Sequence, residues 1–142
     1  MRVGTTASGL IVRLEPDDDV IAQIQAAAAA HHVVNAEVTG LGSVEAPTLA
    51  HYRRDTKQFT ERTFDGIFEV VSLVGNISLT DDRPTLHCHV IISDAGMTTH
   101  GGHLVRATCS ATLELIIRQL DTTYIKRRDD AVGLNVWQLP TA

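Results

Sequence analysis

The sequence predicts one α/β domain of the α+β type, in which an antiparallel-rich mixed sheet packs against one main helix. Only the segment that starts at Val20 repeats its apolar residues with the period of a helix. Several other segments alternate polar and apolar residues, or are continuously apolar, as strands do. A chain of 142 residues can bury a real core, so residues 1–142 are expected to form a single domain.

The first elements are a short strand and the helix. Residues 8–14 contain the β-branched pair Ile11 and Val12, and Pro16 ends this predicted strand. The acidic run that closes with Asp19 suits a helix N-terminus, where carboxylates bind free N–H groups. From there, one helical face carries Val20, Ile24, Ala27, Ala28 and His31. The helix is expected to end at His31-His32, because positive charge is favourable at a helix C-terminus.

The remaining elements are predicted to be strands. Residues 34–39 alternate with a period of two, and Gly40 and Gly42 then suggest a turn or a close backbone approach. Residues 109–120 also alternate, with Ile116 as the one apolar exception, so a strand fits better than a helix. The other predicted strands are 47–53 paired with 58–64, 67–79 after an Asp65-Gly66 turn, and a short last strand within 131–139 that contains Trp137.

Two strand segments are apolar on both faces, at 70–74 and at 90–92. Such strands need cover on both sides, but the chain offers one helix. We therefore expect another subunit to cover the second face, in a closed symmetric assembly.

Composition limits the classes of partner. A net charge of −5 argues against a protein built to neutralise phosphates, and the basic triplet 126–128 is followed by two aspartates, so we expect a solvated charged loop there. Cys88 and Cys109 are expected to be buried free thiols, which suits a reducing compartment. With no signal-like N-terminus and no apolar run of about 18 residues, the expected protein is soluble and cytoplasmic, without a membrane partner.

The chemistry concentrates in residues 86–104, which hold four of the seven histidines. His87 and His89 share one face of a predicted strand, since residues two apart in a strand point the same way. If Asp94, Ala95 and Gly96 form a three-residue hairpin loop, His87 faces His103, and all three imidazoles lie on one face. A two-residue loop would place His103 on the opposite face from the other two, and would destroy the cluster unless a bulge restored the parity.

Three neutral imidazoles on one face suit zinc, although nickel, copper and ferrous iron also accept such ligands. Three protein ligands leave one position open for water or a small ligand, as in catalytic zinc sites. The alternative is a set of hydrogen-bonded histidines without metal. Glu69, Glu114 and His100 are the residues expected at the rim of the site, although the three-residue loop would make His100 face away from the other three histidines. A cupin site is excluded, because no glutamate follows the His-x-His pair within 90–96.

The chain resembles the PPC domain, which plants and prokaryotes share, and the match follows the family's order through nearly the whole sequence. It is carried by Thr39-Gly40-Leu41-Gly42-Ser43-Val44, Gly66-Ile67-Phe68-Glu69-Val70-Val71-Ser72-Leu73, Gly75-Asn76-Ile77-Ser78, His87-Cys88-His89, Ser93-Asp94-Ala95-Gly96, Gly101-Gly102-His103-Leu104 and Thr112-Leu113-Glu114. The resemblance implies a homotrimeric α/β domain in which His87, His89 and His103 occupy the metal-site positions of prokaryotic members. Two departures stand out: the chain has no Arg-Gly-Arg-Pro AT-hook, and Arg106 replaces a small or acidic residue.

Three functions follow as hypotheses. The first is a trimeric metal-binding protein, with zinc as the expected metal, whose open site takes a small-molecule ligand or carries out catalysis. The second is a DNA-associated regulator that acts through protein contacts, with direct nucleic-acid binding disfavoured by the acidic charge. The third is a trimeric scaffold in which the histidines only fix the hairpin.

Overall fold

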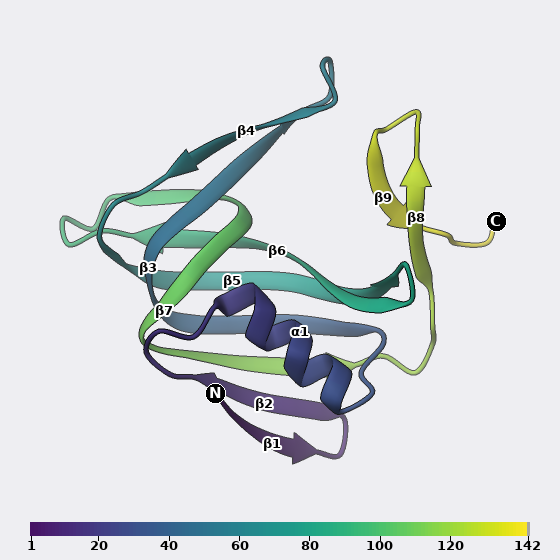
Figure 1. The fold of residues 1–142 in the computed structure, drawn as a ribbon, viewed down its shortest axis with the longest axis horizontal. Helices are drawn as coiled ribbons and strands as arrows, with labels where there is room; N and C mark the ends of the chain where they lie inside the picture. Colours follow the sequence, from purple (N-terminus) through teal and green to yellow (C-terminus); the bar gives the residue numbers. More distant parts are fainter. Residues whose placement is uncertain (142) are drawn as a thin grey trace.

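The computed structural model describes residues 1–141, in which nine strands form one sheet and a single helix packs against it (Figure 1). The predicted class is confirmed: the sheet is mixed, and every strand pair is antiparallel except one. In chain order the elements are β1 (Arg2–Thr6), β2 (Gly9–Leu14), α1 (Val20–Ala30), β3 (Ala36–Arg53), β4 (Gln58–Thr63), β5 (Ile67–Thr80), β6 (Arg83–Ser93), β7 (Thr99–Gln119), β8 (Ile125–Asp129) and β9 (Leu134–Trp137).

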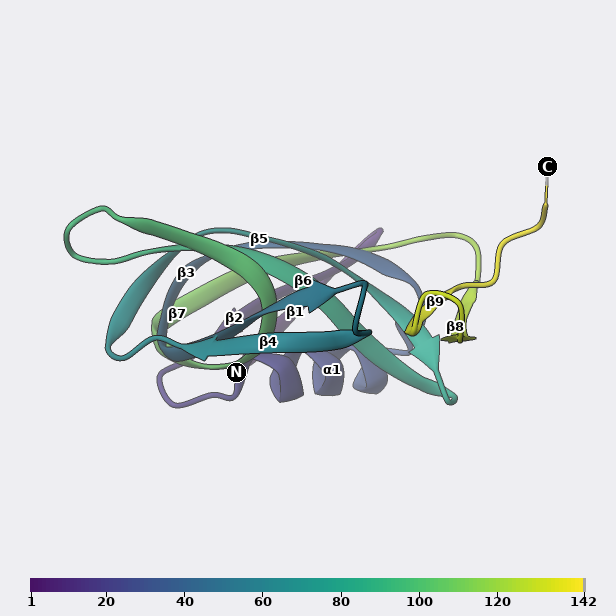
Figure 2. The same cartoon turned by 90° about the horizontal axis from the view of Figure 1, so that it is seen from above.

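The helix α1 forms where the sequence predicts it. The Asp19 carboxylate accepts a hydrogen bond from the backbone N–H of Ala22, and His31 is the C-cap. The buried residues of α1 are Val20, Ile24, Ala27 and Ala28, so the predicted apolar face is the one that packs on the sheet. Figure 2 shows α1 lying across one face of the sheet only.

Four strands close on themselves and create the site's scaffold. β3 pairs with β5, β5 with β6, β6 with β7, and β7 again with β3. This closure is possible because β3 and β7 are long, at 18 and 21 residues, and irregular registers bend them. The histidines of β6 and β7 are neighbours because these two strands pair directly within this closed set.

Gly40 and Gly42 do not form a turn, because β3 continues through both residues. A Cβ atom on Gly40 would lie 2.8 Å from the Leu115 side chain, and one on Gly42 would lie 2.2 Å from the Thr112 carbonyl oxygen. Gly42 also has a φ of 149°. The second sequence-based interpretation, a close backbone approach between strands, is the correct one.

The predicted charged loop at 126–128 is wrong, because these residues lie in β8. β8 pairs in parallel with the end of β5 and antiparallel with β9, so its backbone is held on both sides. The Trp137 side chain, on β9, anchors the hairpin by donating a hydrogen bond from Nε1 to Ser78 Oγ at 2.5 Å. Three consecutive basic residues show no alternation of polar and apolar side chains, so the sequence gives no sign that they pair as a strand.

The sheet face opposite α1 carries exposed apolar side chains. One row of directly paired residues crosses this face through five strands and ends at the histidines: Ile11, Ile116, Thr39, Val74, His89 and His103. Ile11, Ile116 and Val74 are each more than half exposed.

Among residues 1–141, no helix combines the length and the apolar character needed to cross a membrane.

Candidate metal centre

The β6–β7 hairpin places the three predicted histidines on one face, although in a different register from the one expected. Ser93 pairs with Thr99 and His89 pairs with His103, so the loop holds five residues, 94–98, rather than three or two. The Asp94 carboxylate explains the longer loop, because it accepts hydrogen bonds from the backbone N–H groups of Gly96 and Thr98, both at 2.9 Å. Lengthening the loop from three to five residues, a change of two, leaves every side chain of β7 on the same face of the hairpin. The three histidines therefore still share one face.

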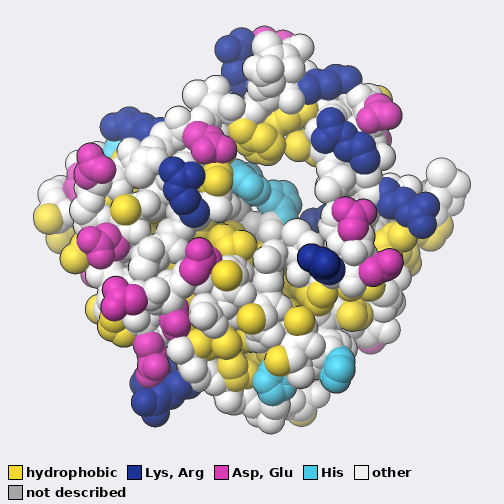
Figure 3. All heavy atoms as spheres, viewed as in Figure 1, with side chains coloured by type: hydrophobic (Ala, Val, Ile, Leu, Met, Phe, Trp, Pro, Cys, Tyr) yellow, Lys and Arg dark blue, Asp and Glu magenta, His cyan; other side chains and the backbone are white. Residues whose placement is uncertain are grey.

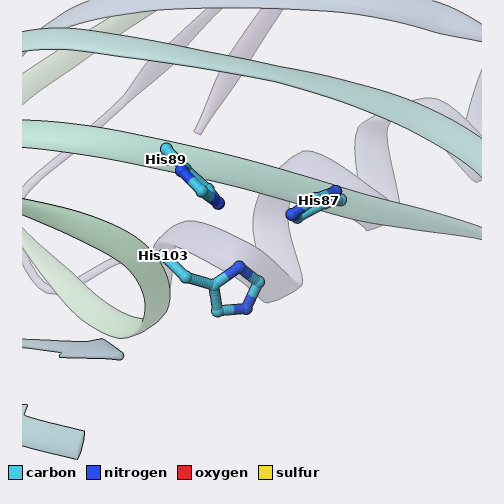
Figure 4. A group of neighbouring side chains, drawn as sticks. All are labelled: His87, His89 and His103. Carbon is cyan, nitrogen blue, oxygen red and sulfur yellow. The ribbon is translucent and has the colours of Figure 1, made fainter. Parts of the chain in front are cut away.

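The three imidazoles converge (Figure 4). Their ring centroids lie 5.2 to 5.6 Å apart, and one ligand nitrogen from each ring lies within 4.8 Å of the others. Tetrahedral zinc with bonds of about 2.1 Å needs nitrogens roughly 3.4 Å apart. The rings therefore need to close in by only about 1 Å or slightly more, which small side-chain rotations can supply. The donor set fits a divalent transition metal with three protein ligands.

The surroundings of His87 and His103 favour the neutral imidazole, which is the form that binds metal. Burial, the Lys126 charge and the two neighbouring histidines lower the pKa of His87 to about 4. Burial and His89 lower the pKa of His103, against a smaller opposing effect of Glu61. Cys88 points to the core side, and burial raises the pKa of its thiol to about 12, so it offers no thiolate to a metal.

A cavity of about 380 Å³ opens beside the cluster. In Figure 3 it is visible as a hollow with histidine side chains at its edge. Two hairpins wall it: β3–β4 contributes Tyr52 and Phe59, and β8–β9 contributes Lys126, Leu134 and Asn135. The remaining lining residues are Thr80, Thr85, His87, His89 and His103.

The three residues expected near the rim lie elsewhere, and among residues 1–141 none of them lines this cavity. Glu69 pairs with Ser93, four residues along β6 from His89 and about 13 Å away at strand spacing. Glu114 pairs with Arg13, eleven residues along β7 from His103. His100 faces away from the cluster, as predicted, and its ring packs 4.6 Å from that of Phe64.

Sequence reasoning missed the cavity walls. Phe59 lies on an exposed strand, and Lys126 looked like part of a solvated triplet. Both reach the cavity because separate hairpins fold toward the histidines, an arrangement that has no local sequence signal. The one available hint was Trp137, a lone tryptophan whose indole N–H seeks a hydrogen-bond acceptor on another element.

Comparison with known structures supports the same fold. A metal-containing protein from Archaeoglobus fulgidus has a TM-score of 0.85 at 25% identity, over 98% of this chain and 100% of that one. A plant- and prokaryote-conserved (PPC) protein from Pyrococcus horikoshii has a TM-score of 0.86 at 22% identity, over 99% and 96%. A Bacteroides thetaiotaomicron protein described as a "putative dna binding protein" has a TM-score of 0.92 at 20% identity, over 96% of both chains.

No curated protein matches the chain in sequence. The Plants and Prokaryotes Conserved (PCC) domain matches residues 1–121, which is most of the chain and includes every strand from β1 to β7 and all three clustered histidines. The predicted resemblance is therefore confirmed, and the chain belongs to the Plants and Prokaryotes Conserved (PPC, or PCC) domain family.

Proposed function

We propose that this PPC-domain protein binds one divalent transition metal ion per chain, with zinc as the preferred metal, through His87, His89 and His103. The observation that carries the proposal is the convergence of three ligand nitrogens within 4.8 Å of one another beside an open cavity. The low pKa of His87 supports it, because a metal then competes with few protons at neutral pH. The metal-containing relative from Archaeoglobus fulgidus supports it further.

His87, His89 and His103 would hold the metal with three protein ligands, one fewer than a closed structural zinc site has, so a further ligand could bind to it. Such an ion supplies Lewis acidity and can bind a small ligand directly. No carboxylate lines the cavity within residues 1–141, so a metal-bound water would have no acidic side chain as its general base. We therefore propose small-ligand binding as the primary role of the open position.

Elemental analysis of protein purified without an affinity tag tests the metal site. We expect about one transition metal ion per chain in the wild type, and a His87→Ala/His103→Ala variant should lose it. The matched control is His31→Ala/His32→Ala, which removes two histidines at the end of α1, far along the chain from the cluster. Equal metal content in wild type and the cluster variant, or none in either, would refute the site.

We also propose that the protein is a homotrimer, as the family resemblance implies, and that it works in the reducing cytoplasm. The uncovered apolar face supports the assembly, since large exposed apolar patches mark interfaces. The two buried free cysteines support the compartment. Sedimentation analysis should give a trimer mass, and Val74→Asp should dissociate it, whereas Leu139→Asp, outside the row, should not. A wild-type monomer at micromolar concentration would overturn the assembly.

A second candidate function is a DNA-associated regulator that acts through protein contacts. The observation in its favour is that two relatives, from Bacteroides thetaiotaomicron and Ralstonia eutropha, carry DNA-binding descriptions. The net charge of −5 weighs against direct phosphate contacts. A fluorescence anisotropy titration with DNA across salt concentrations distinguishes the metal-binding function from the regulator. We expect no DNA binding at physiological salt, whereas tight binding that weakens steeply with salt would favour the regulator.

A further inference from the structure

We propose that the cavity beside the histidines binds a small organic anion, with its charged head between the metal ion and the Lys126 ammonium group and its apolar part against Tyr52, Phe59 and Leu134. This inference rests on the proposed function, because the metal supplies one of the two positive charges. The ligand class is a carboxylate or a phosphate ester with an aromatic or aliphatic body.

The lining of the cavity, within residues 1–141, contains a basic side chain and no acidic one. Lys126 is the one lysine or arginine among the ten lining residues, and none of them is an aspartate or glutamate. The Lys126 Nζ atom donates a hydrogen bond to the neutral Asn76 Oδ1 at 2.6 Å, and it lies 4.9 Å from the Trp137 ring centroid. A divalent ion on the histidines would raise the local charge to +3, with no anion from the protein in the lining to balance it.

Acidic groups of the flanking hairpins are engaged with other protein groups, and Asp81 and Asp82 line a neighbouring pocket with Lys126 rather than this cavity. Glu61, whose charge acts on His103, lies 4.0 Å from the Arg106 guanidinium group. Asp129, at the end of β8, accepts hydrogen bonds from the backbone N–H groups of Ala131 and Val132 in the hairpin turn. An external anion is therefore the natural counter-charge, and partial burial strengthens its attraction to both cations.

Lys126 is close enough to share a ligand with the metal. Asn76, which accepts from the Lys126 Nζ atom, is paired directly with His87 across β5 and β6. Side chains in such pairs have Cβ atoms about 5 Å apart. One carboxylate or phosphate group can thus coordinate the metal with one oxygen and accept from Lys126 with another.

The opposite wall suits the apolar body of the ligand. The rings of Tyr52 and Phe59 lie 5.0 Å apart, and the Phe59 ring lies 5.4 Å from that of His103. Leu134 completes this wall from β9. A volume of about 380 Å³ lies within the range of small-molecule sites.

Two contacts hold the β8–β9 hairpin in place over the cavity. Tyr52 Oη donates to the Val132 carbonyl oxygen at 2.5 Å, and Lys57 Nζ donates to that of Asp130 at 2.6 Å. This hairpin follows residue 121, where the family match ends, whereas the histidines lie inside the match. Lys126 and Leu134 therefore lie outside the family match, whereas the metal ligands, Tyr52 and Phe59 lie inside it.

The test uses the full-length protein loaded with Co²⁺, whose visible absorption responds to a change of ligand. Metal content and circular dichroism are measured first for wild type, Lys126→Gln, Lys126→Arg and the control Arg127→Gln, which removes the neighbouring positive charge of β8 outside the lining. Each protein is then titrated with benzoate, phenyl phosphate and the neutral analogue benzamide. The two anions distinguish a carboxylate head from a phosphate head.

We expect at least one of the two anions to change the wild-type spectrum, and Lys126→Gln to weaken that binding about tenfold or more, as loss of a charge-assisted hydrogen bond does. Lys126→Arg and Arg127→Gln should bind within about threefold of wild type, and benzamide should not bind. Equal affinity in wild type and a fully metal-loaded Lys126→Gln, or binding of benzamide as tight as benzoate, would overturn the inference and leave the metal site standing. A wild type without metal would overturn both. If Lys126→Gln does not fold, the comparison of the anions with benzamide in wild type decides.

Discussion

Replacing Gly75 with alanine should damage both the fold and the metal site, because β5 and β6 approach too closely there for any side chain. Gly75 pairs with Cys88, between the two histidines of β6. A Cβ atom on Gly75 would lie 2.5 Å from the His87 carbonyl oxygen and 2.6 Å from the Cys88 Cβ atom. Ordinary contacts need about 3.5 Å, so the two strands would have to separate by about 1 Å.

That separation sets the size of the effect. Backbone hydrogen bonds between the two strands, about 2.9 Å long, would stretch well beyond 3.2 Å. Losing two of them at about 1 kcal/mol each, together with the strain of overpacking, would lower the free energy of unfolding by about 2 to 3 kcal/mol. We expect urea denaturation of Gly75→Ala to show this loss of stability and elemental analysis to show reduced metal content. Gly4→Ala is the matched control, because its Cβ atom would meet nothing closer than 4.0 Å. A Gly75→Ala variant that retains its metal and has a free energy of unfolding within about 0.5 kcal/mol of wild type would show that β5 and β6 have room for a side chain at this position.

Three further predictions concern the cap, the core and pH. Asp19→Ala should cost about 1 kcal/mol in urea denaturation, because the Ala22 N–H loses its acceptor, whereas Asp19→Asn should cost less. Ile24→Ala should cost about 2 to 5 kcal/mol, since the side chain is fully buried, whereas Ile116→Ala in the monomer should cost far less; equal losses would contradict the packing of α1. The metal-free protein should lose stability as pH falls from about 6.5 toward 4, because His87 is protonated in the unfolded chain over this range but stays neutral in the folded chain. The His87→Gln variant should therefore show a smaller fall in melting temperature over this pH range.

The fold could be predicted largely from local patterns. The helix was identifiable because Asp19 caps it and its apolar residues repeat at helical spacing. Residues 109–120 were identifiable as a strand because a period of two is independent of distant contacts, and β7 continues through Gln119. The Gly40 and Gly42 pair was ambiguous, since a turn and a close strand approach need the same residue and only Leu115 and Thr112, far along the chain, distinguish them.

The sequence by itself determined that His87, His89 and His103 can share a face, because the alternation of side chains along strands is a local property and only the parity of the loop matters. It did not determine the loop length, which depends on hydrogen bonds of the Asp94 carboxylate. Only the tertiary structure decided which residues surround the cluster. The strand registers place Glu69 opposite Ser93, four residues along β6 from His89, and Glu114 eleven residues along β7 from His103, and two hairpins bring Phe59 and Lys126 toward the cluster. The physical reason is the distance along the chain. Which face each histidine occupies depends only on residues within one hairpin, whereas the cavity wall depends on packing between segments that lie dozens of residues apart in the sequence.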